Sequence, residues 1–142
     1  MDHLNRAQRS KNMAAVKGRN TIPELAVRKF LRKSGVFYRC HANDLPGKPD
    51  ISIKKYKLAL DVHGCFWHGH LDCKKSKLPR TNTEFWQNKI NQNRARDART
   101  AELFKEIGFD YFIIWECELP KLAESCLSTF IELYHSRKQD LV

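Results

Sequence analysis

Histidine and cysteine side chains gather in one short segment, residues 63–73, and their spacing suits metal chemistry. Cys65, His70 and Cys73 are close enough in sequence for a single loop to wrap a metal ion. A closed tetrahedral site needs a fourth ligand, and Cys117, just past an apolar run, is the best candidate. Three thiolates and an imidazole favour zinc. The sequence therefore predicts a structural zinc site; the alternative for each cysteine alone is a small buried hydrophobic residue.

A second constellation consists of acidic residues on two short predicted strands. Asp50 follows a proline at the start of the first strand, and Asp61 and His63 point to one face of the second, because strand side chains alternate. A hairpin would bring them together. The pattern is similar to the Pro-Asp…(Asp/Glu)-x-Lys metal site of restriction-enzyme-like nucleases, with His63 at the lysine position. Carboxylates suit Mg²⁺, and the Val62 carbonyl could be a further ligand. Alternatively, Asp50 caps a turn and Asp61 is a surface acid.

Three further side chains could move protons. His63 and His68 remain after the zinc ligands are assigned, and imidazoles transfer protons near neutral pH; the alternative is a core or surface role. Asp97 interrupts the buried stripe of a predicted helix, where an isolated charge is costly. It would either form a salt bridge with a neighbouring arginine or orient a histidine or a water molecule at a metal.

Aromatic side chains flank the same segment. Phe66 and Trp67 are adjacent and cannot both enter one core easily, and Trp86 opens the following helix. In a basic protein, exposed aromatic rings favour base stacking or insertion into a duplex. Packing around the zinc loop is the equally weighted alternative.

The elements that must position these residues read as an α/β domain with a central mixed sheet. A helix is predicted to begin at Thr21–Glu24, which have capping-box spacing, and to end at Gly35. Further predicted elements are strands over 37–40, 50–53, 58–63 and 109–115 and helices over 83–107 and 119–135. The apolar run 109–115 is typical of a strand covered on both faces.

Composition sets the broad class. The chain has 142 residues, a formal charge of +10 and a pI near 9.6, with positive charge concentrated in 6–33 and 74–99. This favours a polyanion partner such as a nucleic acid. Because the sequence has neither a long apolar stretch nor an apolar N-terminus, we expect a cytoplasmic protein whose cysteines are thiols or metal ligands.

A set of short motifs, in order, resembles the very short patch repair (Vsr) endonucleases. The blocks span roughly residues 9–117, and Gly-Cys-Phe-Trp-His is the most distinctive run within them. They are Arg9–Met13, Leu45–Asp50, His63–His68, Thr83–Trp86 and Trp115–Cys117.

The resemblance implies a restriction-endonuclease-like fold and nicking of DNA 5′ to the thymine of a T:G mismatch left by deamination of 5-methylcytosine. It implies that Asp50 and the Val62 carbonyl bind Mg²⁺, that His68 is the general base, and that His63 and Asp97 hold water and orient the site. The zinc ligands would be those named above. Phe66, Trp67 and Trp86 would intercalate, while a basic arm over residues 1–20, with Arg9, Lys11 and Met13, would grip the other groove.

Residues 21–142 would then form a single endonuclease domain that acts as a monomer on mismatched double-stranded DNA, near the nucleoid and with mismatch-repair proteins as further candidate partners. One departure from the family pattern is Asp61, where the family has no acid. This residue slightly favours a restriction-type nuclease that cuts matched DNA. A third hypothesis is a zinc-stabilised DNA-binding module without catalysis.

Overall fold

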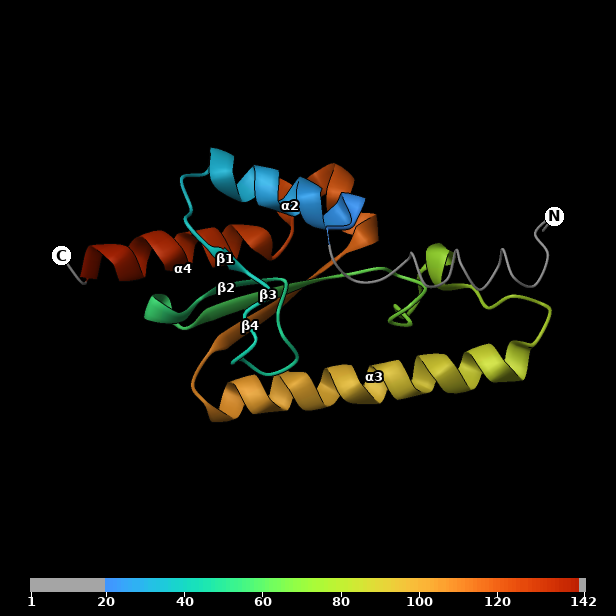
Figure 1. Cartoon of the computed structure of the whole chain (residues 1–142). Coiled ribbons are helices and arrows are strands. Elements are labelled where there is room, and N and C mark those ends of the chain that lie inside the picture. Colours follow the sequence, from blue (N-terminus) through green and yellow to red (C-terminus); the bar gives the residue numbers. More distant parts are fainter. Residues whose placement is uncertain (1–19, 141–142) are drawn as a thin grey trace.

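A four-stranded mixed sheet organises the computed structural model, which describes residues 20–140 (Figure 1). The strands are β1 (Arg39–Cys40), β2 (Ile51–Ile53), β3 (Leu58–His63) and β4 (Asp110–Trp115), in the spatial order β1-β2-β3-β4. β2 is antiparallel to both β1 and β3, whereas β3 and β4 are parallel. The mixed α/β architecture and the hairpin between the second and third strands agree with the sequence prediction.

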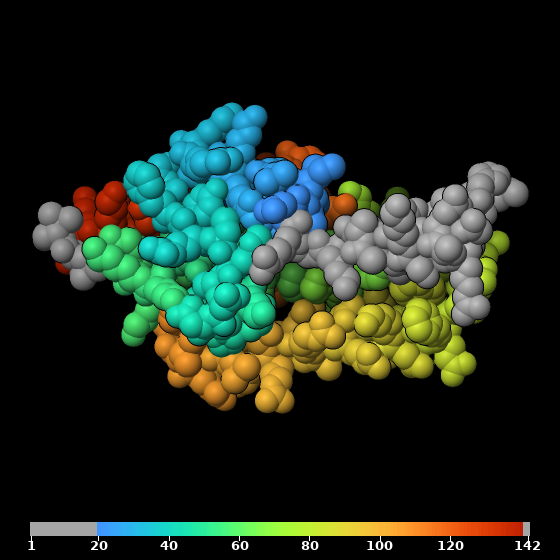
Figure 2. Space-filling view, viewed as in Figure 1, coloured from blue at the N-terminus to red at the C-terminus, as the bar shows by residue number. Residues whose placement is uncertain are grey.

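Helices cover both faces of this sheet. α2 (Ile22–Lys33) and α4 (Leu127–Asp140) lie on one face, and α3 (Thr83–Glu106) lies on the other (Figure 1). α3 provides the long crossover that two parallel strands require. In the space-filling view it forms an extended ridge along one side of the molecule (Figure 2).

The two faces of β3 have different roles. Leu58, Leu60 and Val62 pack in the main hydrophobic cluster with residues of α2 and α4, such as Leu31 and Phe130. Because side chains alternate along a strand, Asp61 and His63 face α3 instead. The strand therefore anchors itself with one face and presents polar groups with the other.

The start of α2 follows its sequence signals. Thr21 is the N-cap, and its hydroxyl accepts the Glu24 N–H at 3.2 Å. The helix ends at Lys33 and is followed by Gly35 with a φ of +76°, a conformation that glycine adopts without strain. Leu25 in this helix is 45% exposed, whereas Val27 is fully buried.

One prediction about the C-terminal third needs correction. The last helix begins at Leu127, not near residue 119, because a 3₁₀ segment, η3 (Glu116–Glu124), precedes it. Pro120 lies inside this segment and Lys121 leaves helical geometry, which interrupts the α-helical pattern.

β4 is covered on both faces as expected, by Phe104 against Tyr111 and by Phe130 against Phe112. However, it is an edge strand, and therefore only Ile114 is fully buried within it.

Two further sequence predictions concern the N-terminal arm and the relation of the chain to membranes. The predicted basic arm over 1–20 lies, apart from its last residue, outside the described residues. Within residues 20–140, the helices lack the combination of length and apolar character that crossing a membrane requires.

Truncation of the core under α4 provides a test of this packing. We expect Phe130→Ala to lower the free energy of unfolding by about 3–5 kcal/mol, because the ring is fully buried and its removal leaves a cavity. Urea unfolding followed by circular dichroism measures the change. Phe37→Ala is the control, since this ring is 76% exposed and its loss should cost roughly 0.5 kcal/mol or less. Equal losses in the two variants would contradict the packing.

Candidate active and metal-binding centre

Asp50 and Asp61 close the end of the ladder between β2 and β3. The last paired residues are Ile51 and Leu60. Beyond them, the Asp50 N–H donates to Asp61 Oδ1 at 2.8 Å, and the Val62 N–H donates to Asp50 Oδ2 at 2.8 Å. The two predicted acids are therefore brought together, and the Val62 backbone lies beside them.

Three residues that the sequence analysis missed surround Asp50. Oxygen atoms of Glu24 and Asp50 and a ring nitrogen of His41 lie within 4.8 Å of one another. His41 Nε2 is 3.1 Å from Glu24 Oε2 and 3.8 Å from Asp50 Oδ1, and Arg28 forms an ion pair with Glu24. Glu24 is only 1% exposed, although it occupies the first turn of α2, where a capping residue would face solvent. The capping-box spacing concealed this second role.

Burial and crowding change the proton affinity of the acid pair. Burial, together with the nearby charge of Asp61, raises the pKa of Asp50 to about 7. Burial also raises the pKa of Asp61, although the hydrogen bond from Tyr111 opposes this change. Two carboxylates this close repel each other, so the site favours either a shared proton or a bound cation.

His63, His68 and Asp97 form a second cluster next to the acids. One ligand atom from each lies within 4.8 Å of the other two. His68 Nδ1 is 2.7 Å from Asp97 Oδ2, and the two imidazole rings are stacked with centroids 3.7 Å apart. Because the Asp97 carboxylate accepts a hydrogen bond, Nδ1 carries the proton and Nε2 of His68 is left as a proton acceptor. Of the two roles predicted for Asp97, a salt bridge with an arginine or a contact with a histidine, the structure shows the contact with a histidine.

His63 is held in the neutral form. It is 4% exposed, and burial, reinforced by the nearby His68, lowers its pKa to about 4. Its Nδ1 is buried and has no hydrogen-bond partner within residues 20–140. Such an atom in a polar centre is a position for a water molecule or a ligand.

The four predicted zinc ligands also converge. Side-chain ligand atoms of Cys65, His70, Cys73 and Cys117 lie within 4.8 Å of one another. Cys117 Sγ is 3.5 Å from His70 Nδ1, and Cys65 is fully buried. Cys40, which is exposed, and Cys126, which is partly buried, lie outside this group.

Close packing against α3 fixes the loop that carries these ligands. Gly69 has a φ of +62°, and a Cβ atom there would lie 2.5 Å from Ile90 Cγ2. Asn93 on the same helix donates a hydrogen bond to the Trp67 carbonyl at 2.8 Å. The His70 N–H donates to the Cys65 carbonyl at 2.9 Å, which closes the turn. A side chain at position 69 would therefore require both a strained backbone and displacement of Ile90.

The three predicted intercalating residues form one aromatic group. Ring centroids of Phe66, Trp67 and Trp86 are 5.1–5.8 Å apart in edge-to-face arrangements. All three are half-buried, and Phe85, which contacts Trp86, is 60% exposed. The rings therefore pack together and still present a surface. The predicted contacts Arg9, Lys11 and Met13 lie outside the described residues.

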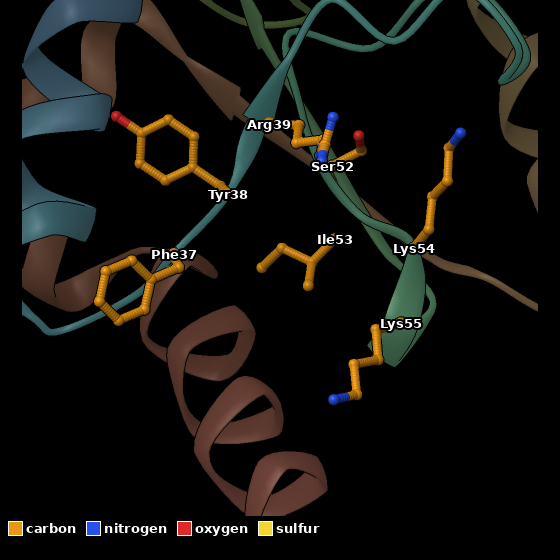
Figure 3. A pocket seen from close by; sticks show the side chains of 7 residues that line it. All are labelled: Phe37, Tyr38, Arg39, Ser52, Ile53, Lys54 and Lys55. Carbon is orange, nitrogen blue, oxygen red and sulfur yellow. The ribbon is translucent and has the colours of Figure 1, made fainter.

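A hollow of about 500 Å³ lies away from all of these groups. Residues 37–39 and 52–55 line it, with Phe37 and Tyr38 on one side and Lys54 and Lys55 on the other (Figure 3). It contains none of the predicted site residues. A polymer substrate needs an accessible face rather than an enclosed pocket, and we therefore place the chemistry at the clusters.

A family model and several known proteins are similar to this chain. The family model described as DNA mismatch endonuclease Vsr matches residues 1–75. The DNA mismatch endonuclease Vsr of Escherichia coli K12 is 39% identical over 92% of this chain and 85% of its own length. The type II nicking enzyme V.NmeAIP of Neisseria meningitidis serogroup A is 42% identical over 86% of this chain and 86% of its own length. The type II nicking enzyme V.XorIIP of Xanthomonas oryzae is 43% identical over 85% of this chain and 88% of its own length.

The raised pKa of Asp50 predicts a pH dependence of stability. In buffer without magnesium, and with any metal in the Cys/His cluster left in place, Asp50 of the folded protein keeps its proton at pH values where the same carboxyl is ionised in the unfolded chain. The stability that comes from this difference is fully present below about pH 4 and is lost as the pH rises to about 7.

Asp50→Asn cannot ionise and keeps an oxygen for the Val62 N–H. At pH 8 we expect it to exceed the wild type in unfolding free energy by on the order of 1–3 kcal/mol, with a smaller difference at pH 5. Urea unfolding at both pH values measures this. Asp140→Asn, at an exposed position of α4, is the control. A pH-independent difference would contradict the assignment.

Proposed function

Because the chain belongs to the Vsr family of DNA mismatch endonucleases, we propose that it nicks one strand of DNA in mismatch repair, 5′ to the thymine of a T:G mismatch. The relatives named as nicking enzymes support single-strand cleavage. The family also supports a restriction-endonuclease-like description of the fold, built on the mixed sheet with helices on both faces.

The pairing of His68 with Asp97 carries this proposal. A carboxylate that holds Nδ1 fixes the ring and leaves Nε2 ready to accept a proton from a water molecule. Both side chains are about one quarter exposed, at 29% and 23%, so that solvent and a phosphate can reach the pair. His63, neutral and stacked on His68, keeps that ring in place and can exchange hydrogen bonds with water.

The acid cluster fits a magnesium ion. Asp50 and Glu24 offer carboxylate oxygens close together, and the Val62 backbone lies beside Asp50, joined to it through the Val62 N–H. Hard oxygen donors in small number are what Mg²⁺ takes from proteins. When bound, the ion would polarise the scissile phosphate and stabilise the leaving 3′-oxygen. Asp50 and Glu24 would hold it, while Arg28 balances the buried charge of Glu24.

The Cys/His cluster fits a structural zinc ion. Its donors are three thiols and one imidazole, a closed set of four that leaves no position for substrate. Cys65 lies between His63 and His68 in sequence, and ligation of its thiolate would therefore hold both ends of the catalytic turn.

DNA is proposed to contact the face formed by the aromatic group and α3. The net charge of +10 supports phosphate contacts, and Phe66, Trp67 and Trp86 would insert beside the mismatch. A T:G wobble pair should be easier to unstack than a matched pair, and insertion of these aromatic rings would therefore favour mismatched over matched DNA. The residue 1–20 arm, with Arg9, Lys11 and Met13, would contact the other groove.

Residues 21–142 are proposed to form one endonuclease domain that acts as a monomer in the bacterial cytoplasm, on the nucleoid. The family supports mismatched double-stranded DNA as the partner, and mismatch-repair proteins are proposed as further partners.

Nicking of defined duplexes tests the catalytic assignment. We expect Asp50→Ala to abolish Mg²⁺-dependent nicking of a T:G duplex without loss of binding, and Asp97→Asn to lower the single-turnover rate by roughly 10²–10⁴-fold through loss of the oriented base. Gel analysis of an end-labelled strand measures both. Glu102→Gln, an exposed neighbour on α3, is the matched control.

Two outcomes of that assay would overturn the proposal. Equal cutting of a matched duplex would favour a restriction-type nuclease, and tight binding without cleavage in any context would favour a non-catalytic module.

Loss of one cluster ligand tests the zinc site. We expect wild-type protein to hold zinc and Cys117→Ser to lose it, because three remaining donors bind the ion more weakly. Elemental analysis measures zinc content, and thermal unfolding should show a lower midpoint. Cys40→Ser changes an exposed cysteine outside the cluster and should retain the metal. Unchanged zinc content in Cys117→Ser would exclude this residue as a ligand.

A further inference from the structure

Asp61 uses both of its carboxylate oxygens within the protein. Oδ1 accepts the Asp50 N–H at 2.8 Å, and Oδ2 accepts a short hydrogen bond from the Tyr111 hydroxyl on the neighbouring strand β4. Besides its contact with Asp50, the side chain is close enough to His68 and Asp97 for their charges to influence its pKa. Hydrogen bonds from Asp50 and from Tyr111 therefore fix the position of the Asp61 carboxylate.

Packing holds Tyr111 rigidly in place. Its ring is stacked on that of Phe104, with centroids 4.7 Å apart and planes 15° apart, and Phe104 is fully buried. Burial and the charge of Asp61 raise the pKa of the Tyr111 hydroxyl far above its usual value, so that it keeps its proton and remains a donor. A fixed donor of this kind orients the carboxylate that accepts from it.

The bonds between Asp50 and Asp61/Val62 form a reciprocal pair. Each strand supplies one backbone N–H and one carboxylate at the point where the backbone ladder stops. This arrangement fixes the backbone of Asp50 as well as its side chain. Asp50 Oδ1 consequently faces His41 and Glu24. Among the described residues, Asp61 belongs to none of the three groups with metal-ligand spacing.

We propose that Asp61, oriented by Tyr111, is a positioning residue that holds Asp50 for magnesium and is not itself a ligand of the ion. The inference rests on the proposed function, because it concerns the site assigned there to magnesium. It places the second acid of the hairpin outside the metal's ligand set, although its sequence position matches the second acid of restriction-enzyme-like nucleases.

Tyr111→Phe separates positioning from ligation, because it leaves both carboxylates and removes only the hydroxyl. If Asp61 positions Asp50, the loss of its orienting donor should weaken Mn²⁺ binding by about tenfold. If Asp61 were a ligand, release of Oδ2 from a competing donor would leave Mn²⁺ affinity unchanged or increase it. Electron paramagnetic resonance of free Mn²⁺, with zinc retained, measures affinity without any need for activity. Tyr56→Phe, which changes a tyrosine near α4, is the matched control.

Asp61→Asn provides the second measurement. The amide oxygen can still accept the Asp50 N–H but is held less firmly, and we therefore expect kcat for nicking at saturating metal to fall by only about fivefold. Asp50→Asn should lose at least about hundredfold under the same conditions. A loss in Asp61→Asn as large as that in Asp50→Asn would overturn the proposal, as would unchanged Mn²⁺ affinity in Tyr111→Phe.

Failure of the proposed function would look different. Wild-type protein that neither binds Mn²⁺ at this site nor nicks a T:G duplex would refute the nuclease assignment itself. Wild-type activity with Mn²⁺ affinity unaltered in Tyr111→Phe would refute only the positioning role. Zinc content and circular dichroism of each variant establish that it is folded.

Discussion

The position of one buried thiol constrains the whole active centre. Cys65 lies between His63 and His68 in the chain and converges with three other ligand side chains, one of which comes from η3. His70, from the same cluster, stacks on Trp115 at 4.0 Å, and the Trp115 ring in turn contacts His63 edge-on. The histidines that would handle protons are thus held by the residues proposed to bind zinc. On the proposed function, a zinc ion at this cluster would serve catalysis by fixing the positions of the histidines and not by chemistry of its own.

The two faces of the sheet have different surroundings, one apolar and one polar, and this difference explains how a small domain supports a polar centre. One face of β3 lies in the apolar cluster with α2 and α4, which anchors the strand. The other face carries Asp61 and His63 toward α3, which contributes Asp97. Regular secondary structure therefore positions Asp61, His63 and Asp97. His68 is the exception, because it lies in the loop after β3. That loop is held by its close approach to α3 at Gly69 and by the cysteines.

Much of this arrangement could be predicted from sequence because the signals are local. Residue type and spacing indicated the Cys/His cluster, and strand alternation placed Asp61 and His63 on one face. Glu24 was missed because its spacing from Thr21 also fits a helix cap, and only tertiary contacts with Arg28 and His41 turn the carboxylate inward. The partner of Asp97 was one of two alternatives, because periodicity places a residue on a helix face but does not identify the side chain opposite. The start of the last helix was wrong because apolar periodicity continues through a segment that Pro120 keeps out of α-helical geometry.

The order of the site residues along the chain has a consequence for biosynthesis. Asp50 and the histidines come early, but Asp97 lies on α3, and Cys117 follows β4. Because domains are completed from the N-terminus during translation, a nascent chain that has emerged only through β3 carries the acids without the oriented base or a complete cysteine cluster. On the proposed function, a partly made chain would lack residues needed for cleavage until Cys117 has emerged, and this late completion would limit premature nicking without a separate inhibitor.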